Sequence, residues 1–381
     1  YRERENHISS DSWPIYISLQ KDGILFKMRR TQDLPDKESA TMFFQDCKLA
    51  HQAQITGISH SVKEILPPDL LDLTQLQKEA NIRYGYTASE VYDIAQSLYE
   101  KKLISYPRTS SRYLTEDVFD SLSPIMTRLL SWELFPVAKG TGGIDISSLS
   151  RHVISAEKAN VHHAIIITGI RPGNMSEKEM QVYRLVAGRM LEVFMAPCRI
   201  ETTNVEAVCA AQHFKAEQTR IIEAGWHDVF MHSDMIPTSG YSVKELPEVE
   251  KGDTLNVCGC NMVHKKQLPV DPFTDAELVE YMELNGLGTV SSRTNIIRTL
   301  VNRKYIRYSG KYIVPTPKGM FTYETIRGKK IADTSLTADW EKQLTGLESG
   351  MITGQDFLNR IRTLAKEMTD DIFNTYSTKE E

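Results

Sequence analysis

The spacing of apolar residues changes twice along this 381-residue chain, and this change constrains the fold more than any other feature of the sequence. Residues 10–62 alternate apolar and polar positions and carry the hairpin signal Asp22-Gly23, which is typical of paired β-strands. From about Gln75 to Arg199 the period becomes helical, and residues 200–265 return to strand-like runs. The sequence therefore predicts one β domain into which a helical block is inserted.

Helix starts are marked by capping boxes, in which a Ser or Thr precedes a Glu by three residues. Thr87 and Ser176 open two such boxes inside the helical block, and Thr274 opens a third after the second β segment. We therefore expect a further helical region after about residue 267.

A helix over residues 291–303 is followed by a short hairpin from Tyr305 to Val314 that turns at Ser309-Gly310. Four apolar residues of this helix are expected to face inward: Ile296, Ile297, Leu300 and Val301. A helix followed by a wing-like hairpin is typical of winged-helix-like DNA binders.

Positive charge is concentrated in this same region, although the whole chain carries a net charge of -5. Between Arg293 and Lys330 ten Lys or Arg residues stand against one acid, Glu324. Such segregation favours a surface that faces phosphate groups.

A possible nucleophile follows the helix that Thr87 begins. Pro107 biases Tyr106 away from helix, and Arg108 falls on the same side of an extended segment as Tyr106. A phenol is a poor nucleophile near neutral pH unless positive charge stabilises the phenolate, and Arg can also bind a phosphate. Tyr106 and Arg108 are thus the fewest groups that could attack a phosphodiester: a nucleophile and a cation that binds the phosphate. An ordinary Tyr-Pro turn with a solvated Arg contains the same residues and is the alternative.

The stretch from Ala95 to Leu114 resembles the active-site motif of type IA DNA topoisomerases, in their topoisomerase III branch. The matching residues are Leu98-Tyr99-Glu100, Leu103-Ile104, Tyr106-Pro107-Arg108-Thr109 and Arg112-Tyr113-Leu114. Further motifs resemble the family in the same order: Thr74 to Asn81, His162 to Ile166, Glu201 to Thr203, Gly225-Trp226, and Phe273 to Ile297 with Gly286-Leu287-Gly288-Thr289.

The resemblance implies roles for three catalytic residues. Tyr106 would form a 5′-phosphotyrosine, Arg108 would bind the scissile phosphate, and His162 would steady that phosphate as charge builds on it. The resemblance gives His163 no contact with the phosphate and leaves undecided whether this residue supports the site. The activity implied is cleavage, strand passage and religation of DNA without ATP, which relaxes negative supercoils and decatenates DNA.

Four residues are expected to bind single-stranded DNA: Gln96, Arg112, Arg293 and Arg298. Packing at the edge of the core is an equal alternative for Gln96, and a solvated helix end is the alternative for Arg293. Tyr113, Tyr305 and Tyr308 could stack on bases, although packing is the simpler expectation for each.

The sequence departs from the family pattern in two respects. Ser110 stands where the family usually has Asp, while Ile167 and Ser292 are milder changes. The family's metal-binding Toprim domain carries an Asp-x-Asp-x-Glu cluster, and this chain has none. We therefore expect Mg²⁺ to be bound by a domain before Tyr1, and the chain alone to be inactive.

The fold class expected is α+β and multidomain, with the architecture of a type IA gate. The expected parts are a β-rich arch (residues 1–66 and 200–266), a helical domain carrying Tyr106 (75–199) and a helical, winged-helix-like base (267–381). We expect a cytoplasmic monomer with single-stranded DNA as its partner, no membrane span and no metal bound by this chain. Whether a helicase is a further partner is not decided by the sequence.

Two other classes of protein compete with this interpretation. The first is a non-catalytic single-stranded DNA-binding protein in which the Tyr106 motif is vestigial, and Ser110 gives it some support. The second is a tyrosine recombinase, whose Tyr follows a His-x-x-Arg motif near the C-terminus. Here Tyr106 precedes His162, and Ile165 stands in place of the Arg.

Overall fold

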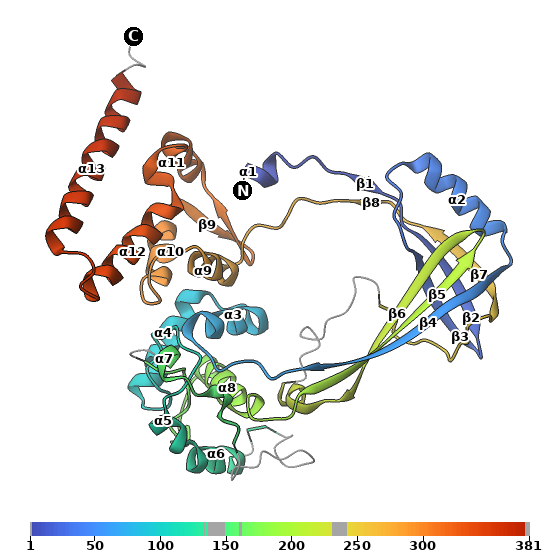
Figure 1. The fold of residues 1–381 in the computed structure, drawn as a ribbon, viewed down its shortest axis with the longest axis horizontal. Coiled ribbons are helices and arrows are strands. Elements are labelled where there is room, and N and C mark those ends of the chain that lie inside the picture. Colours follow the sequence, from blue (N-terminus) through green and yellow to red (C-terminus); the bar gives the residue numbers. More distant parts are fainter. Residues whose placement is uncertain (1, 133, 136–148, 160–161, 231–241, 378–381) are drawn as a thin grey trace.

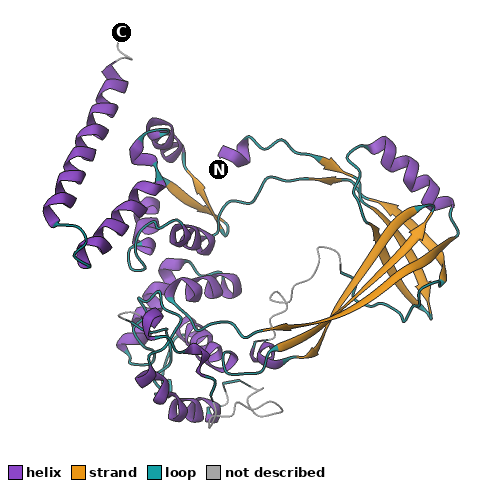
Figure 2. Cartoon of the chain, in the orientation of Figure 1, coloured by secondary structure: helices purple, strands orange, loops and turns teal. Residues whose placement is uncertain are grey.

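The computed structural model describes residues 2–132, 134–135, 149–159, 162–230 and 242–377. Its elements form a barrel (strands β2 to β7), a helical body (helices α3 to α8) and a base (elements α9 to α13), and Figure 1 shows these three parts arranged as a ring. Strands are concentrated in the barrel and in its extension toward the helical body, while helices make up most of the other two parts (Figure 2). The α+β multidomain class predicted from the sequence is confirmed.

Six antiparallel strands close the barrel in the order β2-β3-β6-β5-β4-β7. The strands are β2 (Ile15–Lys21), β3 (Ile24–Arg30), β4 (Gln52–Ile65), β5 (Cys198–Cys209), β6 (Gln212–Glu223) and β7 (Thr254–Met262). Alternate residues of β2 point inward, and Ile15, Ile17 and Leu19 are fully buried. The two β segments predicted from the sequence therefore meet in one barrel.

A helix that the sequence analysis did not predict lies against this barrel. The prediction of a β-rich segment over residues 10–62 is wrong for α2 (Lys37–Leu49), whose N-terminus is capped by Asp36. Only Ala40 and Cys47 of this helix are buried, so its apolar face is narrow and gives a weak periodic signal.

The helical body contains α3 (Leu73–Tyr84), α4 (Ala88–Glu100), α5 (Glu116–Asp120), α6 (Leu122–Ser131), α7 (Ala156–Ala159) and α8 (Glu177–Glu192), with the short 3₁₀ turn η3 (Arg151–Val153). The predicted capping boxes at Thr87 and Ser176 are confirmed as the starts of α4 and α8. One apolar core joins helices α3, α4, α5, α6 and α8, and Leu98 and Ile104 belong to it.

The base contains α9 (Asp275–Leu284), α10 (Arg293–Asn302), β9 (Ile306–Ser309), β10 (Tyr312–Pro315), α11 (Pro317–Ile326), the 3₁₀ turn η6 (Lys330–Ala332), α12 (Thr334–Glu348) and α13 (Gly354–Ser377). The capping box at Thr274 and the hairpin between Tyr305 and Val314 are confirmed. The inward prediction for α10 holds for Ile297, but Ile296 is 38% exposed, because only one face of this helix packs on the core.

Two connections join the barrel to the rest of the ring. The short strands β1 (Asp11–Ser12) and β8 (Lys265–Lys266) pair as a strap toward the base, where α1 (Arg2–Glu5) also lies (Figure 1). On the other side the long strands β4 to β6 reach the helical body, where the 3₁₀ turn η4 (Gly225–Val229) follows them. The indole N–H of Trp226 donates to the Ile65 carbonyl at 2.8 Å and so closes this junction.

Polar contacts close the ring between the helical body and the base. Lys78 pairs with Glu280 at 2.7 Å, and the buried Gln77 amide donates to the Thr294 hydroxyl at 3.0 Å. The Asp275 carboxylate, at the start of α9, accepts the backbone N–H of Ala88 at the start of α4. Burial raises the pKa of the Asp275 carboxyl.

No helix in the described ranges is long and apolar enough to cross a membrane.

Candidate active site

The chain reverses direction where α4 ends. Lys102 adopts a left-handed conformation with φ 60°, and the N–H groups of Lys102 and Leu103 donate back to the carbonyls of Tyr99 and Leu98. This is a Schellman-type helix end, with Lys in the position where Gly is most common. The reversal sends residues 103–108 back along the helix that they have just left.

A short bridge then pairs this segment with the His162 segment. Ile104 pairs with Ile167, and the Ser105 N–H donates to the Ile166 carbonyl at 2.8 Å. The Ser105 hydroxyl also accepts the N–H of Ile166 at 3.0 Å. These bonds place Tyr106 beside His162, although the two residues are far apart in sequence.

The ring of Tyr106 lies between two other rings. The ring centroids of Tyr106 and His162 are 4.6 Å apart, and the edge of Tyr99 contacts Tyr106 at 5.4 Å with an interplanar angle of 75°. Tyr106 is half-buried, whereas His162 is exposed. The predicted pair of Tyr106 and His162 is thus brought together at the surface of the helical body.

Arg108 lies against the same helix as Tyr106. One terminal guanidinium nitrogen donates to the Gln96 side-chain oxygen at 3.4 Å, and the guanidinium carbon lies 5.1 Å from the centre of the Tyr92 ring. Its Nε atom is buried and has no hydrogen-bond partner in the described part of the chain. Gln96 also donates to Glu100 at 2.8 Å, so this amide links Arg108 to the end of α4.

The residues around this group fix its backbone. The Thr109 hydroxyl donates to the His162 carbonyl at 3.0 Å. The His163 ring contacts its neighbour's carbonyl at Ala164, 2.7 Å away, rather than Tyr106. Ser110, the departure from the family pattern, is exposed.

The other predicted DNA-binding arginines each pair with an acidic residue. Arg112 pairs at 2.7 Å with Asp72, the residue that caps α3. Burial raises the pKa of the Asp72 carboxyl, while the Gln75 amide and the Arg112 guanidinium oppose this shift. Arg112 therefore has a structural partner in the helical body.

Arg293 and Arg298 both belong to α10. Arg293 is only 8% exposed; its nearest acid, Glu283, is 3.5 Å away, and its Nε and Nη1 atoms have no hydrogen-bond partner in the described ranges. Arg298 instead bonds Ser89 and pairs with Asp93 at 2.8 Å, so it joins the base to α4.

The three tyrosines considered as base-stacking residues all have protein partners. Lys158 lies over the ring of Tyr113 and Lys318 over that of Tyr305, at 4.8 and 4.4 Å. The Tyr308 hydroxyl donates to Asp275 at 2.8 Å, and burial raises the pKa of this phenol.

A carboxylate anchors the turn that precedes Tyr106. Glu179, in the first turn of α8, accepts hydrogen bonds from the Lys101 ammonium at 2.6 Å and from the Ser97 hydroxyl at 2.7 Å. The Lys101 hydrogen bond, followed by the Ser176 backbone and Ser97, lowers the pKa of Glu179 to about 2. Glu179 thus ties α8 to the end of α4.

This lowered pKa predicts a pH-dependent contribution to stability. Because the folded-state pKa lies below the ordinary value, the contribution is present above about pH 4.5 and is lost as pH falls toward 2. Glu179→Gln keeps a residue able to form the capping box and removes the charge. We expect it to lower the free energy of unfolding by about 1 kcal/mol at pH 7, and by a smaller amount at pH 3.5, where unfolded chains already bind a proton at this carboxylate while the folded protein mostly does not.

Chemical unfolding of both proteins at the two pH values measures this difference. Glu177→Gln, in the same first turn, is the matched control, since that carboxylate contacts only Gln181 of its own helix among the hydrogen bonds described. A deficit of Glu179→Gln that stays constant with pH would exclude the ionic contact as its cause.

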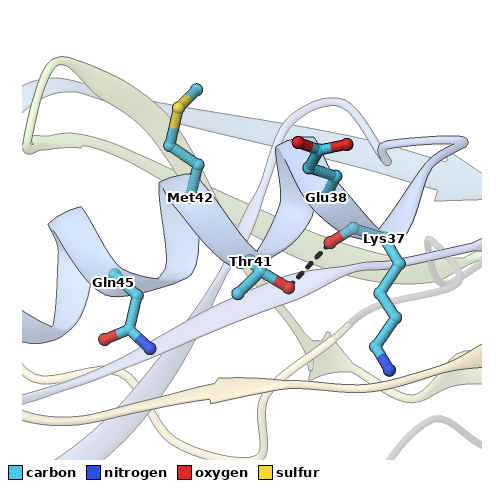
Figure 3. Close-up of a pocket in the computed structure, with 5 residues that line it drawn as sticks. All are labelled: Lys37, Glu38, Thr41, Met42 and Gln45. Carbon is cyan, nitrogen blue, oxygen red and sulfur yellow. Dashed lines mark hydrogen bonds between the residues drawn. The ribbon is translucent and has the colours of Figure 1, made fainter.

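Two surface hollows in the described ranges are lined by residues other than Tyr106. The first is a hollow along a single helix, α2, lined by Lys37, Glu38, Thr41, Met42 and Gln45 (Figure 3). The second, of about 210 Å³, lies between α4, α10 and β9, where Asp275 and Arg298 line it. With Tyr106 half-buried and His162 exposed, the candidate site lies at the surface of the helical body.

No group of three or more His, Cys, Asp or Glu side chains that could hold a metal ion occurs within the described ranges. The residues around Tyr106 are aromatic, basic and neutral polar, so they do not fit a Mg²⁺ site, which requires oxygen ligands and usually carboxylates.

Tyr92 and Tyr99, which contact Arg108 and Tyr106, were not predicted as site residues from the sequence. A signal for both was present. They lie four residues before and three after Gln96, and this spacing places all three on one face of a helix.

The chain is similar to several known proteins. Residues 1–359 match the family model described as DNA topoisomerase. The chain is 31% identical to DNA topoisomerase 3 of Bacillus licheniformis over 344 residues, covering 84% of this chain and 47% of that protein. It is 30% identical to DNA topoisomerase 3 of Bacillus subtilis over 352 residues, covering 86% and 48%. The chain thus spans about half the length of these relatives.

The fold is similar to that of full-length topoisomerase I from Thermotoga maritima. The two structures superpose with a TM-score of 0.74 at 21% sequence identity, covering 96% of this chain and 60% of the other. At this identity the likeness concerns the fold alone.

Proposed function

Because the chain belongs to the DNA topoisomerase family, in the topoisomerase III branch of type IA, we propose that it is the strand-cleaving and gate-forming part of such an enzyme. The observation that carries this proposal is the meeting of Tyr106, His162 and Arg108 on one surface of the helical body. The three residues come from two separate segments, which the hydrogen bonds between Ser105 and Ile166 hold together.

Tyr106 acts as the nucleophile. Its phenol loses a proton to solvent, and the oxygen forms a bond to the phosphorus of one DNA strand. The bond between phosphorus and the 3′ oxygen breaks with its electron pair on that oxygen, which takes up a proton and leaves as a 3′-hydroxyl. The product is a 5′-phosphotyrosine, and religation reverses each step without ATP.

Arg108 and His162 act on the phosphate. A guanidinium can donate two hydrogen bonds to phosphate oxygens, and an exposed imidazole 4.6 Å from the nucleophile's ring can donate a third. Such donors stabilise the charge that builds on the phosphate in the transition state.

Single-stranded DNA is the proposed substrate. The four residues predicted to bind it, Gln96, Arg112, Arg293 and Arg298, differ in how free their side chains are to contact a phosphate. Gln96 lies next to Arg108. Arg293 pairs with Glu283, but this contact is longer, at 3.5 Å, and two of its donors remain unsatisfied in the described ranges. Arg112 and Arg298 must first leave Asp72 and Asp93 or share their charge with these acids. We therefore expect Gln96 and Arg293 to contribute more to binding.

The ring arrangement supports a gate. We propose that residues 1–66 and 200–266 form the arch, 75–199 the tyrosine domain and 267–381 the base. Opening would separate the tyrosine domain from the base and break the Lys78–Glu280 contact described above, while the arch keeps the parts connected.

Mg²⁺ and the cellular setting are further parts of the proposal. We propose that the enzyme uses Mg²⁺ bound by a separate metal-binding domain, since the aromatic, basic and neutral polar side chains around Tyr106 do not suit this ion. It supplies positive charge at the DNA phosphates when present. The enzyme acts as a monomer in the cytoplasm, where it relaxes negative supercoils and decatenates DNA.

Transfer of label to the full-length protein tests this function. The protein is mixed with Mg²⁺ and 3′-end-labelled single-stranded DNA, and the reaction is stopped with detergent. The label should stay with the protein, because a 5′-phosphotyrosine retains the fragment with the 3′ end; 5′-end label should stay on free DNA. Tight DNA binding with no transfer of either label would contradict the proposal and favour a non-catalytic single-stranded DNA-binding protein.

A further inference from the structure

One face of α4 carries three residues in a row, Tyr92, Gln96 and Tyr99, and both Tyr106 and Arg108 rest on it. The first and last of the three are about 10 Å apart along a helix that rises 1.5 Å per residue. Tyr99 contacts Tyr106 at one end, while Gln96 and Tyr92 contact Arg108 toward the other. A single helix face thus touches the proposed nucleophile and its arginine together.

The geometry of the chain explains this double contact. After the reversal at Lys102 the extended segment runs antiparallel to α4. Residues two apart in an extended segment are separated by about 6.6 Å and point to the same side. Tyr106 and Arg108 therefore both face the helix, in the reverse order of the residues that they contact.

The contacts of Arg108 are with neutral groups. No carboxylate in the described ranges forms an ion pair with it, whereas Arg112 and Arg298 are held by Asp72 and Asp93. An aromatic face attracts a guanidinium without cancelling its charge. Arg108 is thus oriented, yet its charge stays available for a phosphate.

The contact of Tyr99 with Tyr106 limits the orientations of the Tyr106 ring. The edge-to-face arrangement at 5.4 Å and 75° is a favourable geometry for two aromatic rings. His162 covers another side of the Tyr106 ring at 4.6 Å. Between these two neighbours the phenol has few orientations left, so its oxygen is aimed before DNA arrives.

We propose that Tyr92 and Tyr99 are positioning residues for strand cleavage, Tyr92 by holding the Arg108 guanidinium on its ring face and Tyr99 by orienting the Tyr106 ring. This inference rests on the proposed function, and it assigns a role to two side chains that do not themselves contact the reacting atoms. What each supplies is an aromatic ring; the hydroxyl group of neither is needed.

Replacement of each tyrosine by Phe and by Leu tests the proposal in the full-length protein. The measured quantities are the single-turnover rate of cleavage of labelled single-stranded DNA, its dissociation constant and the melting temperature. Tyr92→Leu and Tyr99→Leu should each lower the cleavage rate about fivefold, with the dissociation constant changed less than about twofold. Tyr92→Phe and Tyr99→Phe should cleave at nearly the wild-type rate, since they keep the ring.

Tyr86→Leu is the matched control. Tyr86 also carries a cation over its ring, Lys178 at 4.9 Å, but it precedes α4 at the end away from Tyr106. This variant should cleave like the wild type, which separates the loss of an aromatic contact in general from its loss beside Arg108.

Two results would overturn the inference while leaving the proposed function intact: Leu variants that cleave at the wild-type rate, or Phe variants that lose as much rate as Leu variants. Absence of covalent adduct in the wild type itself would instead reject the proposed function, and the inference with it. If a Leu variant fails to fold, the corresponding Phe variant still decides, since a defect there contradicts the proposal.

Discussion

Tyr106→Phe should abolish formation of the covalent DNA adduct and lower the cleavage rate by about 10⁵-fold or more, the scale seen when a catalytic nucleophile is removed. The reason is chemical, because phenylalanine has no oxygen that could bond to phosphorus. The ring itself remains, so its contacts with Tyr99 and His162 should persist. Folding and DNA affinity should therefore stay close to those of the wild type.

Detergent-trapped adduct and DNA affinity, measured on the same preparations of full-length protein, check this expectation. Tyr113→Phe is a suitable control, since it removes a phenol in the same segment whose oxygen lies 3.4 Å from Lys158 rather than near Tyr106. An adduct that persists in Tyr106→Phe would place the nucleophile elsewhere in the protein. Loss of DNA binding in that variant would instead show that the phenol oxygen helps to bind the ground state.

Local signals in the sequence predicted local structure well. The capping boxes at Thr87, Ser176 and Thr274 each begin a helix with both reciprocal hydrogen bonds formed. Asp22-Gly23 turns a hairpin with positive φ at both residues, as such a dipeptide favours. These features depend on residues within a few positions of one another, so the sequence alone contains their cause.

Local signals of this kind could not predict which distant strands pair with each other. Ile17 of β2 pairs with Cys260 of β7, and this closure of the barrel depends on two strands that are about 240 residues apart. Helix α2 was missed for the opposite reason, because it buries only Ala40 and Cys47 and so shows little periodicity. The one local signal named above, the N-cap residue Asp36, was not recognised in the sequence.

The candidate site likewise combines features that a local stretch of sequence suggests with features that depend on distant residues. The spacing of Tyr106 and Arg108 did not distinguish a nucleophile from an ordinary Tyr-Pro turn, and the resemblance to a family decided for the nucleophile and added His162. Charge alone could not assign Arg112 and Arg298, since their acidic partners Asp72 and Asp93 come from other segments. A cation in a sequence is a candidate for DNA only until its partner in the fold is known.

The second large effect concerns a buried ionic network in the helical body. Arg189 of α8 is 6% exposed and pairs with Glu192 at 2.9 Å and Glu79 at 2.8 Å, while it also donates to the Asp69 carbonyl at 3.0 Å. Glu192 is fully buried. Arg189→Met should lower the free energy of unfolding by about 3–5 kcal/mol, because it removes a cation from beside a buried carboxylate.

Urea unfolding of the wild type and Arg189→Met measures this loss, and a double variant identifies its cause. Arg189→Met with Glu192→Gln should recover part of the stability, since the second change removes the charge that lost its partner. Arg184→Met on the same helix is the control; Arg184 is exposed over the Phe135 ring, and its loss should cost less than about 1 kcal/mol. If Arg189→Met cost no more than this control, the network would be neutral to stability, and the junction of α3 with α8 would depend on its apolar core alone.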